Sequence, residues 1–238
     1  MATDTRAPGH AAPVAFCDPA ARKWVLTVAI LVSSLGFIDS SVTSIALPAI
    51  RTSLGATLAQ AQWIGSAYLL VLAALILAGG ALGDRFGTVR VFAVGIVIFV
   101  IASALCALAP TAETLIAARA LKGGGAALMV PGSMAIIGKA YPRSERGRAL
   151  GLWSAASAIT TALGPVLGGL LLTLGPDWAW RLIFAINLPL GLLALWLLLS
   201  HVRPDPGRPE VPVDVAGALL ATTGLGLMAY TLTSPGAN

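Results

Sequence analysis

A carboxylate and two basic side chains stand inside long apolar stretches of this chain, where ionisable groups are expensive to place. Asp39 lies within the apolar run Trp24–Ile50. Arg119 and Lys122 lie three residues apart within Leu115–Ala140. Because residues three apart share one face of a helix, both cations can reach the same partner. A charge in hydrocarbon costs about 2.5–3.5 kcal/mol even on insertion scales, so such residues indicate a functional site by default.

The three charges are also predicted at similar depths in a membrane. Asp39 is 11 residues from Ile50, the outer end of its run. Lys122 and Arg119 are 11 and 8 residues from Thr111, near the outer end of theirs. At about 1.5 Å per residue these depths are about 16, 16 and 12 Å, which predicts one cluster near the midplane in which Asp39 carries protons. The alternatives are a capped carboxylate near the outer end and cations that snorkel to the interface.

Hydroxyl and aromatic side chains near these charges are candidates for a substrate cavity. Four hydroxyl residues follow Asp39 within five positions, in the segment F-I-D-S-S-V-T-S-I-A-L-P. Such hydroxyls can face a cavity or bond back to carbonyls of their own helix, and both interpretations stay open. The candidate cavity residues are Ser40, Thr43, Trp63, Tyr68 and Met129.

A short charged segment, Gly80–Arg90, joins the apolar runs Ile64–Leu82 and Val91–Ala109, each 19 residues long. Its glycines permit a sharp turn and close approach of helices. We therefore predict a tight hairpin on the cytoplasmic side of a membrane. Its glycines and charged residues, which the family resemblance given below assigns to inner-face gating, are Gly80, Gly83, Asp84, Arg85, Gly87 and Arg90.

A glycine-rich stretch with one proline lies in the run Ala149–Leu174. Pro165 removes a helix hydrogen bond and kinks the segment, while Gly164 and Gly168 form a small face for close helix packing. The pattern is compatible with a hinge and equally with ordinary tight packing. The candidate hinge residues are Gly151, Gly164, Pro165, Gly168 and Gly169.

The composition is that of a polytopic membrane protein. Hydrophobic residues make up 57% of the chain and charged residues 11%, whereas a soluble domain carries about 25% charge. We predict an all-α fold embedded in a lipid bilayer. We find no catalytic constellation, metal-ligand spacing or cofactor motif, and we expect neither an enzyme nor a nucleic-acid-binding protein. The predicted spans are Trp24–Ile50, Ile64–Leu82, Val91–Ala109, Leu115–Ala140, Ala149–Leu174, Leu182–Leu199 and Val213–Leu232.

The distribution of Lys and Arg predicts the orientation of these spans. With the N-terminus inside, eleven of the 15 basic residues fall on the cytoplasmic side. Only Arg51 and Arg181 fall outside. This bias predicts a cytoplasmic N-terminus. The inner basic residues are Arg6, Arg22, Lys23, Arg85, Arg90, Lys139, Arg143, Arg146, Arg148, Arg203 and Arg208.

Four segments follow from this topology. Residues 1–23 are predicted to be a disordered cytoplasmic tail, and residues 24–200 a six-span unit of two inverted three-helix repeats. Residues 201–212 form a cytoplasmic loop, and residues 213–238 contain the seventh span and its outer end. An odd number of spans leaves one helix without a repeat partner, so we expect a missing C-terminal half in the full-length protein.

Together these motifs resemble the major facilitator superfamily, with the greatest likeness to its fourteen-span drug:proton antiporter branch. G-A-L-G-D-R-F-G-T-V-R is similar to the family's loop motif, and L-I-A-A-R-A-L-K-G-G-G-A to its fourth-span motif. G-P-V-L-G-G resembles the fifth-span motif of antiporters, and the segment around Asp39 resembles the first-span motif of the multidrug branch. The short loop Ser200–Pro212 favours the fourteen-span branch.

The resemblance implies an N-terminal six-helix transporter bundle plus one further transmembrane helix. It implies proton-driven efflux of small molecules across a bacterial inner membrane, with Asp39 and Arg119 in proton coupling. It also assigns Asp84 and Arg85 to an inner-face lock and the fifth-span glycines to the antiporter hinge.

The chain departs from the family pattern at three places. Thr88 and Val89 stand where the loop motif has basic residues, Lys122 replaces a Gln, and Thr160 replaces a Gly. We therefore add Lys122 to the proton-coupling residues. The alternative function is a truncated or non-transporting seven-span membrane protein such as a receptor or sensor.

Overall fold

The computed structural model describes residues 19–210 and 214–233, and within these ranges the regular structure is entirely helical. Among the described residues, six helical segments are long and apolar enough to cross a membrane, with α6 and α7 counted as one segment, Trp180–His201. The protein is therefore an all-α membrane protein. The elements are η1 (Pro19–Ala21), α1 (Arg22–Leu54), α2 (Leu58–Phe86), α3 (Thr88–Leu108), α4 (Ala112–Ala140), α5 (Arg143–Leu174), α6 (Trp180–Ala185), α7 (Asn187–His201) and α8 (Val215–Thr233).

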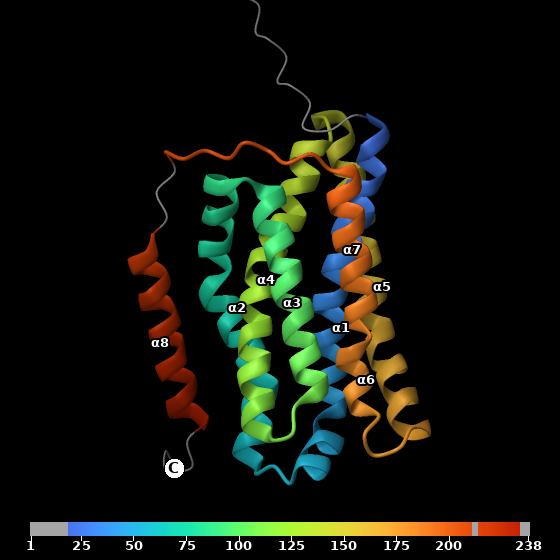
Figure 1. Cartoon of the computed structure of the whole chain (residues 1–238), viewed down its shortest axis with the longest axis vertical. Helices are drawn as coiled ribbons and strands as arrows, with labels where there is room; N and C mark the ends of the chain where they lie inside the picture. The colour runs from blue at the N-terminus through green and yellow to red at the C-terminus, as the bar shows by residue number, and fades with distance from the viewer. Residues whose placement is uncertain (1–18, 211–213, 234–238) are drawn as a thin grey trace, which may run out of the picture.

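Helix α4 lies at the centre of the bundle, packed against α2 and α3, while α1 packs against α5 and α7 (Figure 1). Helix α8 lies beside α2, away from the rest of the bundle, and residues 202–210, which follow α7, run along one end of the molecule (Figure 1). The fold is thus a six-helix bundle with one further helix, as the sequence predicts.

Helices α1 to α5 are longer than the apolar runs from which they were predicted. The charged segment Gly80–Arg90 is almost wholly helical, because α2 continues to Phe86 and α3 begins at Thr88. Only Gly87 breaks the chain direction, with a φ of 97° that favours glycine. The expected eleven-residue turn is therefore a one-residue turn between two helix ends.

Helix α2 also begins earlier than predicted, at Leu58, because a capping box precedes it. The Thr57 hydroxyl accepts from the Gln60 backbone at 3.2 Å, and the Gln60 side chain accepts from the Thr57 backbone at 2.8 Å. This reciprocal pair satisfies two amide groups that would otherwise lack partners. Polar residues can therefore extend the helix beyond its apolar run.

The segments predicted on the cytoplasmic side all lie at one end of the bundle, the upper end in Figure 1. They are the start of α1, the Gly87 turn, the α4–α5 connection and the link to α8. Most of the predicted disordered tail, residues 1–18, lies outside the described residues; η1 and the start of α1 occupy the remainder.

Buried apolar side chains form two clusters, one toward each end of the bundle. The first contains Leu35 and Tyr68, and the second contains Val42 and Leu115. Asp39 lies on α1 between Leu35 and Val42 and is fully buried. The apolar core is therefore divided by a polar layer at the level of this carboxylate.

Glycines on α4 allow α2 and α3 to approach it closely. A Cβ at Gly125 would lie 2.7 Å from the Phe99 backbone nitrogen and 3.0 Å from the Gly95 carbonyl oxygen. A Cβ at the neighbouring Gly124 would meet nothing within 4 Å. Small residues at such contacts permit van der Waals packing that larger ones prevent.

We predict that Gly125→Ala destabilises the bundle and that Gly124→Ala does not. Both changes raise helix propensity by a similar amount, so their difference isolates the overpacking cost of about 1–3 kcal/mol. Thermal unfolding of the purified variants in detergent measures this difference. Equal melting temperatures for the two variants would contradict the close α3–α4 packing described here.

Candidate functional site

The structure brings the three predicted intramembrane charges together. Asp39 lies on α1, and its Oδ1 is 2.5 Å from Nζ of Lys122 on α4. Its Oδ2 is 3.2 Å from Nη1 of Arg119, one turn earlier on α4. The three side chains are at most 1% exposed. One carboxylate therefore joins α1 to two cations of the central helix, without contact with solvent.

Arg119 has further polar partners besides the carboxylate. Its Nη1 donates to the Thr43 hydroxyl at 3.1 Å, and its Nε donates to the backbone carbonyl of Ile64 on α2. The guanidinium group therefore contacts α1 and α2 together. These contacts supply hydrogen bonds that burial takes away from water, as a buried charge requires.

Aromatic rings surround the two cations. Lys122 Nζ lies 4.6 Å from the ring centroid of Phe99 and 5.0 Å from that of Phe184. The Arg119 guanidinium lies 5.4 Å from the centroid of Tyr68. The negative faces of such rings attract cations, most strongly where water is excluded. They help to stabilise a cluster in which two positive charges face one negative charge.

A cavity of about 340 Å³ opens beside the charge cluster, between α1, α2, α4 and α5. Ser40, Tyr68 and Met129 line it, while the half-buried Trp63 and the Arg119-bound Thr43 lie outside the lining. Ser40 donates to the Gly36 carbonyl at 3.0 Å, so its hydroxyl bonds back to its own helix. The cavity walls are mostly apolar, which suits a lipophilic small molecule.

A hydrogen-bonded group at one side of this cavity was not predicted from the sequence. Trp153 Nε1 on α5 donates to the Ser33 hydroxyl at 2.9 Å, and Ser33 donates to Ser133 on α4 at 3.2 Å. Ser34 and Thr160, one of the departures from the family motif, lie 3.1 Å apart. These contacts tie α1 to α4 and α5. Isolated Ser and Trp residues in apolar runs carry no sequence signal for such pairing.

The predicted gating residues lie around the Gly87 turn. Asp84 and Arg90 are exposed, Arg85 is partly buried, and Gly80 and Gly83 lie on the last turns of α2. The Asp84 carbonyl accepts from the Arg208 backbone at 2.8 Å. The link to α8 is therefore hydrogen-bonded to the gating segment.

Asp205 also joins this link to the bundle, and sequence reasoning missed it. Helix α3 has Gly87 at its N-cap and so lacks a capping side chain of its own. The Asp205 carboxylate takes that place, accepting from the Val89 backbone at 3.0 Å. It also pairs with Lys139 of α4 at 2.6 Å. The predicted apolar run begins at Val91, so the sequence did not show that the start of α3 at Thr88 needs a distant acceptor.

The same contacts determine the ionisation of Asp205. Burial raises the pKa of its carboxyl group, but hydrogen bonds from Lys139 and from the backbone of Val89 and Thr88 outweigh burial. The pKa therefore lies below its ordinary value of 3.8, and the group is ionised at neutral pH. Lys139 also donates to the Thr88 hydroxyl at 2.6 Å, so the residue that departs from the family's loop motif takes part in the contact.

The predicted hinge residues divide into two groups. A Cβ at Gly164 would overlap the Ser41 hydroxyl, and a Cβ at Gly168 would overlap a methyl group of Val42, so these glycines let α5 lie against α1. A Cβ at Gly151 or Gly169 would meet nothing within 4 Å. Pro165 lies within the continuous helix α5.

A helical membrane bundle that encloses a charge cluster and an apolar cavity has the architecture of a membrane transporter. The model of the Major Facilitator Superfamily matches residues 29–235. The chain belongs to this family, whose members are transporters and not enzymes.

Two relatives and one solved structure illustrate the similarity. The methylenomycin A resistance protein of Bacillus subtilis is 38% identical over 211 residues, covering 85% of this chain and 44% of that protein. A probable actinorhodin transporter of Streptomyces coelicolor is 38% identical over 229 residues, covering 94% and 39%. A bacterial homologue of the human lysosomal transporter Spinster, in an inward-facing and occupied conformation, is 26% identical with a TM-score of 0.67, covering 81% and 47%. The chain thus spans less than half the length of each.

We predict that Asp205→Asn releases the link from the bundle. The amide lacks the charge that pairs with Lys139, so backbone hydrogen exchange at Val89 and Arg208, whose N–H groups join the bundle and the link, should be at least about fivefold faster at neutral pH, which corresponds to a loss of ~1 kcal/mol. Glu210→Gln, a change of the same type at an exposed residue of the link, is the control. Equal exchange rates in both variants would argue against the docked link.

The lowered pKa of Asp205 also predicts a pH dependence. A carboxyl group with a depressed folded pKa stabilises the contact at neutral pH, and the stabilisation is lost as the pH falls below the ordinary value of 3.8. Oxidative footprinting of the wild-type link should therefore show protection from neutral pH down to about pH 4 and reactivity below it. Loss of protection well above that pH would contradict the contacts assigned to Asp205.

Proposed function

We propose that the protein containing this chain exports small molecules from bacterial cells in exchange for protons. The observation that carries the proposal is the fully buried Asp39 carboxylate, held between Arg119 and Lys122 in the middle of the bundle. An ionisable residue at this depth is expensive and is typically part of an ion or proton pathway. Membership in a transporter family supports a role of the cluster in coupling.

In this proposal the charge state of Asp39 controls the contact between α1 and α4. The ionised carboxylate bridges α1 to both cations of α4, and removing one partner of a buried pair costs about 3–5 kcal/mol. Protonation neutralises the carboxyl group and weakens both bridges at once. Helix α1 can then move against α4, and the bundle changes the side to which its cavity opens.

Proton entry from outside supplies the energy for export. Moving one charge across the membrane is worth about 2.3 kcal/mol per 100 mV. Asp39 takes up a proton from the outer side and releases it inside, where the two cations again stabilise the carboxylate. Lys122 makes the shortest contact to Asp39, at 2.5 Å, and we assign it to proton coupling together with Arg119.

The cargo is proposed to be a small lipophilic molecule bound beside this cluster. The cavity lined by Ser40, Tyr68 and Met129 has mostly apolar walls and lies on the same helices as the charges. The relatives named for methylenomycin A resistance and actinorhodin transport support an antibiotic-like cargo. We keep Thr43 and Trp63 as secondary candidates for cargo contact when the bundle opens.

The proposal also assigns a role to each segment of the chain. Residues 24–200 form the transporter half, built as two inverted three-helix repeats, with the N-terminus and the Gly80–Arg90 segment in the cytoplasm. Residues 201–212 form the inner loop and residues 213–238 carry the seventh span. A second half in the full-length protein completes a fourteen-span antiporter, and the half described here rocks against that second half. Gly164, Pro165 and Gly168 act as the hinge between α5 and α1.

We predict that Asp39→Asn abolishes gradient-driven export while leaving cargo binding intact. The neutral amide cannot carry a proton, although it preserves the size of the side chain. The effect is measured with the full-length protein in proteoliposomes, as efflux of methylenomycin A or ethidium under an imposed proton gradient. Asp177→Asn, at an exposed acid, is the control and should export normally. Full export by the Asp39 variant would remove the carboxylate from the mechanism.

We further predict that Lys122→Gln shifts the pH profile of export toward higher pH. A carboxylate that loses a neighbouring cation holds its proton more readily, so loading no longer requires the same acidity. Lys122→Arg retains the charge and should stay close to the wild-type profile. Proton-driven efflux measured at a series of external pH values tests both variants. An unchanged profile in Lys122→Gln would show that Arg119 alone serves Asp39.

A further inference from the structure

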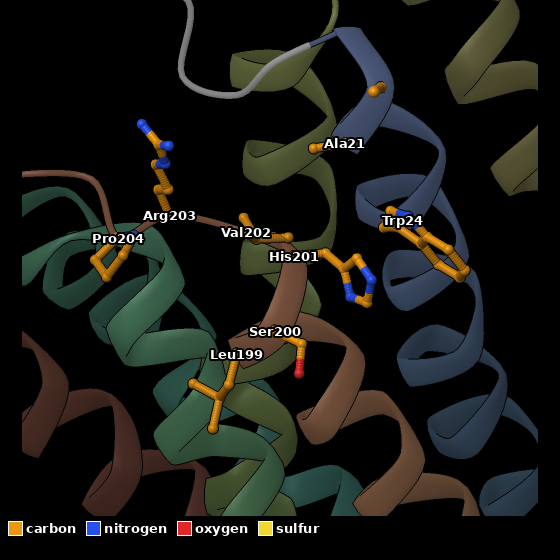
Figure 2. A pocket seen from close by; sticks show the side chains of 9 residues that line it. Ala21, Trp24, Leu199, Ser200, His201, Val202, Arg203 and Pro204 are labelled. Carbon is orange, nitrogen blue, oxygen red and sulfur yellow. The ribbon is translucent and has the colours of Figure 1, made fainter.

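A groove of about 440 Å³ lies at the upper end of the bundle, between the start of α1 and the end of α7, far from the charge cluster (Figure 2). Its volume falls within the range of sites for small ligands, about 300–1,000 Å³. None of the roles assigned above involves it. Its lining residues are Ala20, Ala21, Trp24, Leu199, Ser200, His201, Val202, Arg203 and Pro204.

Two rings face each other across the base of this groove. The centroids of Trp24 and His201 lie 4.4 Å apart at an interplanar angle of 34°, and Figure 2 shows the rings turned toward one another from α1 and α7. His201 Nδ1 lies 3.2 Å from the Leu197 carbonyl oxygen, which fixes the orientation of its ring. The floor of the groove is thus formed by the rings of Trp24 and His201, whose orientations are fixed by their mutual contact and by the Leu197 carbonyl group.

One basic side chain, Arg203, lines the groove, and a second, Lys23, lies outside its lining beside Trp24. Arg203 is exposed, and Lys23 Nζ lies over the Trp24 ring at 5.3 Å from its centroid. No acidic side chain occurs among the nine lining residues. The nearby acids pair elsewhere, since Glu145 contacts Arg22 and Asp205 contacts Lys139. The groove therefore has an excess of positive charge that its own walls do not neutralise.

The side of α7 below the groove is apolar and open. Trp196 is 60% exposed and Leu199 is 64% exposed, and Trp196 also contacts His201 edge-on at 6.1 Å between centroids. A Trp beside basic residues at the end of a membrane helix is typical of the headgroup level of a bilayer. The site therefore presents positive charge, then aromatic rings, then an apolar surface. This order matches the headgroup, the glycerol region and the acyl chains of a phospholipid.

We propose that this groove binds an anionic phospholipid. The phosphate group contacts Arg203 and Lys23, the glycerol region packs on Trp24 and His201, and the acyl chains lie along Trp196 and Leu199. Basic pockets at the end of transmembrane helices bind acidic headgroups in this manner. The site ties the beginning of the six-helix unit to its end through a lipid. Free phosphate shares the charge chemistry but lacks the acyl chains for which the exposed side of α7 is suited.

Tryptophan quenching tests the proposal in the full chain reconstituted in phosphatidylcholine nanodiscs. Small amounts of phosphatidylglycerol brominated on its acyl chains should quench more strongly than the same amounts of brominated phosphatidylcholine, because the acidic lipid is held at Trp24 and Trp196. In a Lys23→Gln/Arg203→Gln variant this preference should fall by about fivefold for each charge removed. A Lys23→Arg/Arg203→Lys variant, which preserves both charges, should keep it.

The matched control is Arg143→Gln/Arg148→Gln, which removes two exposed charges from α5 at the same end of the bundle. It should retain the wild-type preference, and an equal loss in both Gln variants would overturn the proposal by showing a general surface effect. Inorganic phosphate, added at constant ionic strength, should not reverse the quenching. Reversal by free phosphate would overturn the lipid assignment and identify a site for soluble anions. Equal quenching by both brominated lipids in the wild type would also overturn it.

Discussion

A carboxylate that moves from water into a bilayer needs groups that replace its hydration, and here one helix provides them. Lys122 and Arg119 of α4 contact the two oxygens of Asp39 separately, at 2.5 and 3.2 Å. Because α4 is also the helix against which α2 and α3 pack, a change in the charge of Asp39 acts at the centre of the bundle. The apolar clusters on either side of it isolate this interaction from water at both ends.

The position of the charge cluster could be predicted because it depends only on helix periodicity and rise. Asp39, Arg119 and Lys122 lie at matching depths in two apolar runs, and a buried charge has few ways to be satisfied. The contacts of Arg119 with Thr43 and Ile64 could not be predicted in the same way, since they depend on how two helices rotate against a third. The division of the hinge glycines into packed and open positions likewise requires knowledge of which side of α5 faces α1.

The link between α7 and α8 was harder to interpret from the sequence. Its residues have no periodicity, so Asp205 gave no sign that it caps α3 and pairs with Lys139. The apolar runs also underestimated the lengths of helices. In α2, for example, Thr57 and Gln60 form a capping box beyond the apolar part of the helix. Charged residues at the Gly87 turn similarly continue their helices instead of forming a loop. Sequence hydropathy locates the membrane-buried part of a helix and misses the ends, where polar side chains complete it.

The separation of Asp39 from its partners along the chain also constrains the synthesis of the protein and its insertion into the membrane. Arg119 follows Asp39 by 80 positions in the sequence, and a ribosome making about 5–20 residues per second needs about 4–16 s to reach it. During that interval Asp39 has been synthesised, but Arg119 and Lys122, the cations that pair with it in the finished bundle, have not. Until the fourth helix is made, the Asp39 carboxyl group must stay hydrated or protonated, because burial disfavours its unpaired charged form. Stable entry of α1 into the lipid with Asp39 ionised is thus linked to the synthesis of α4.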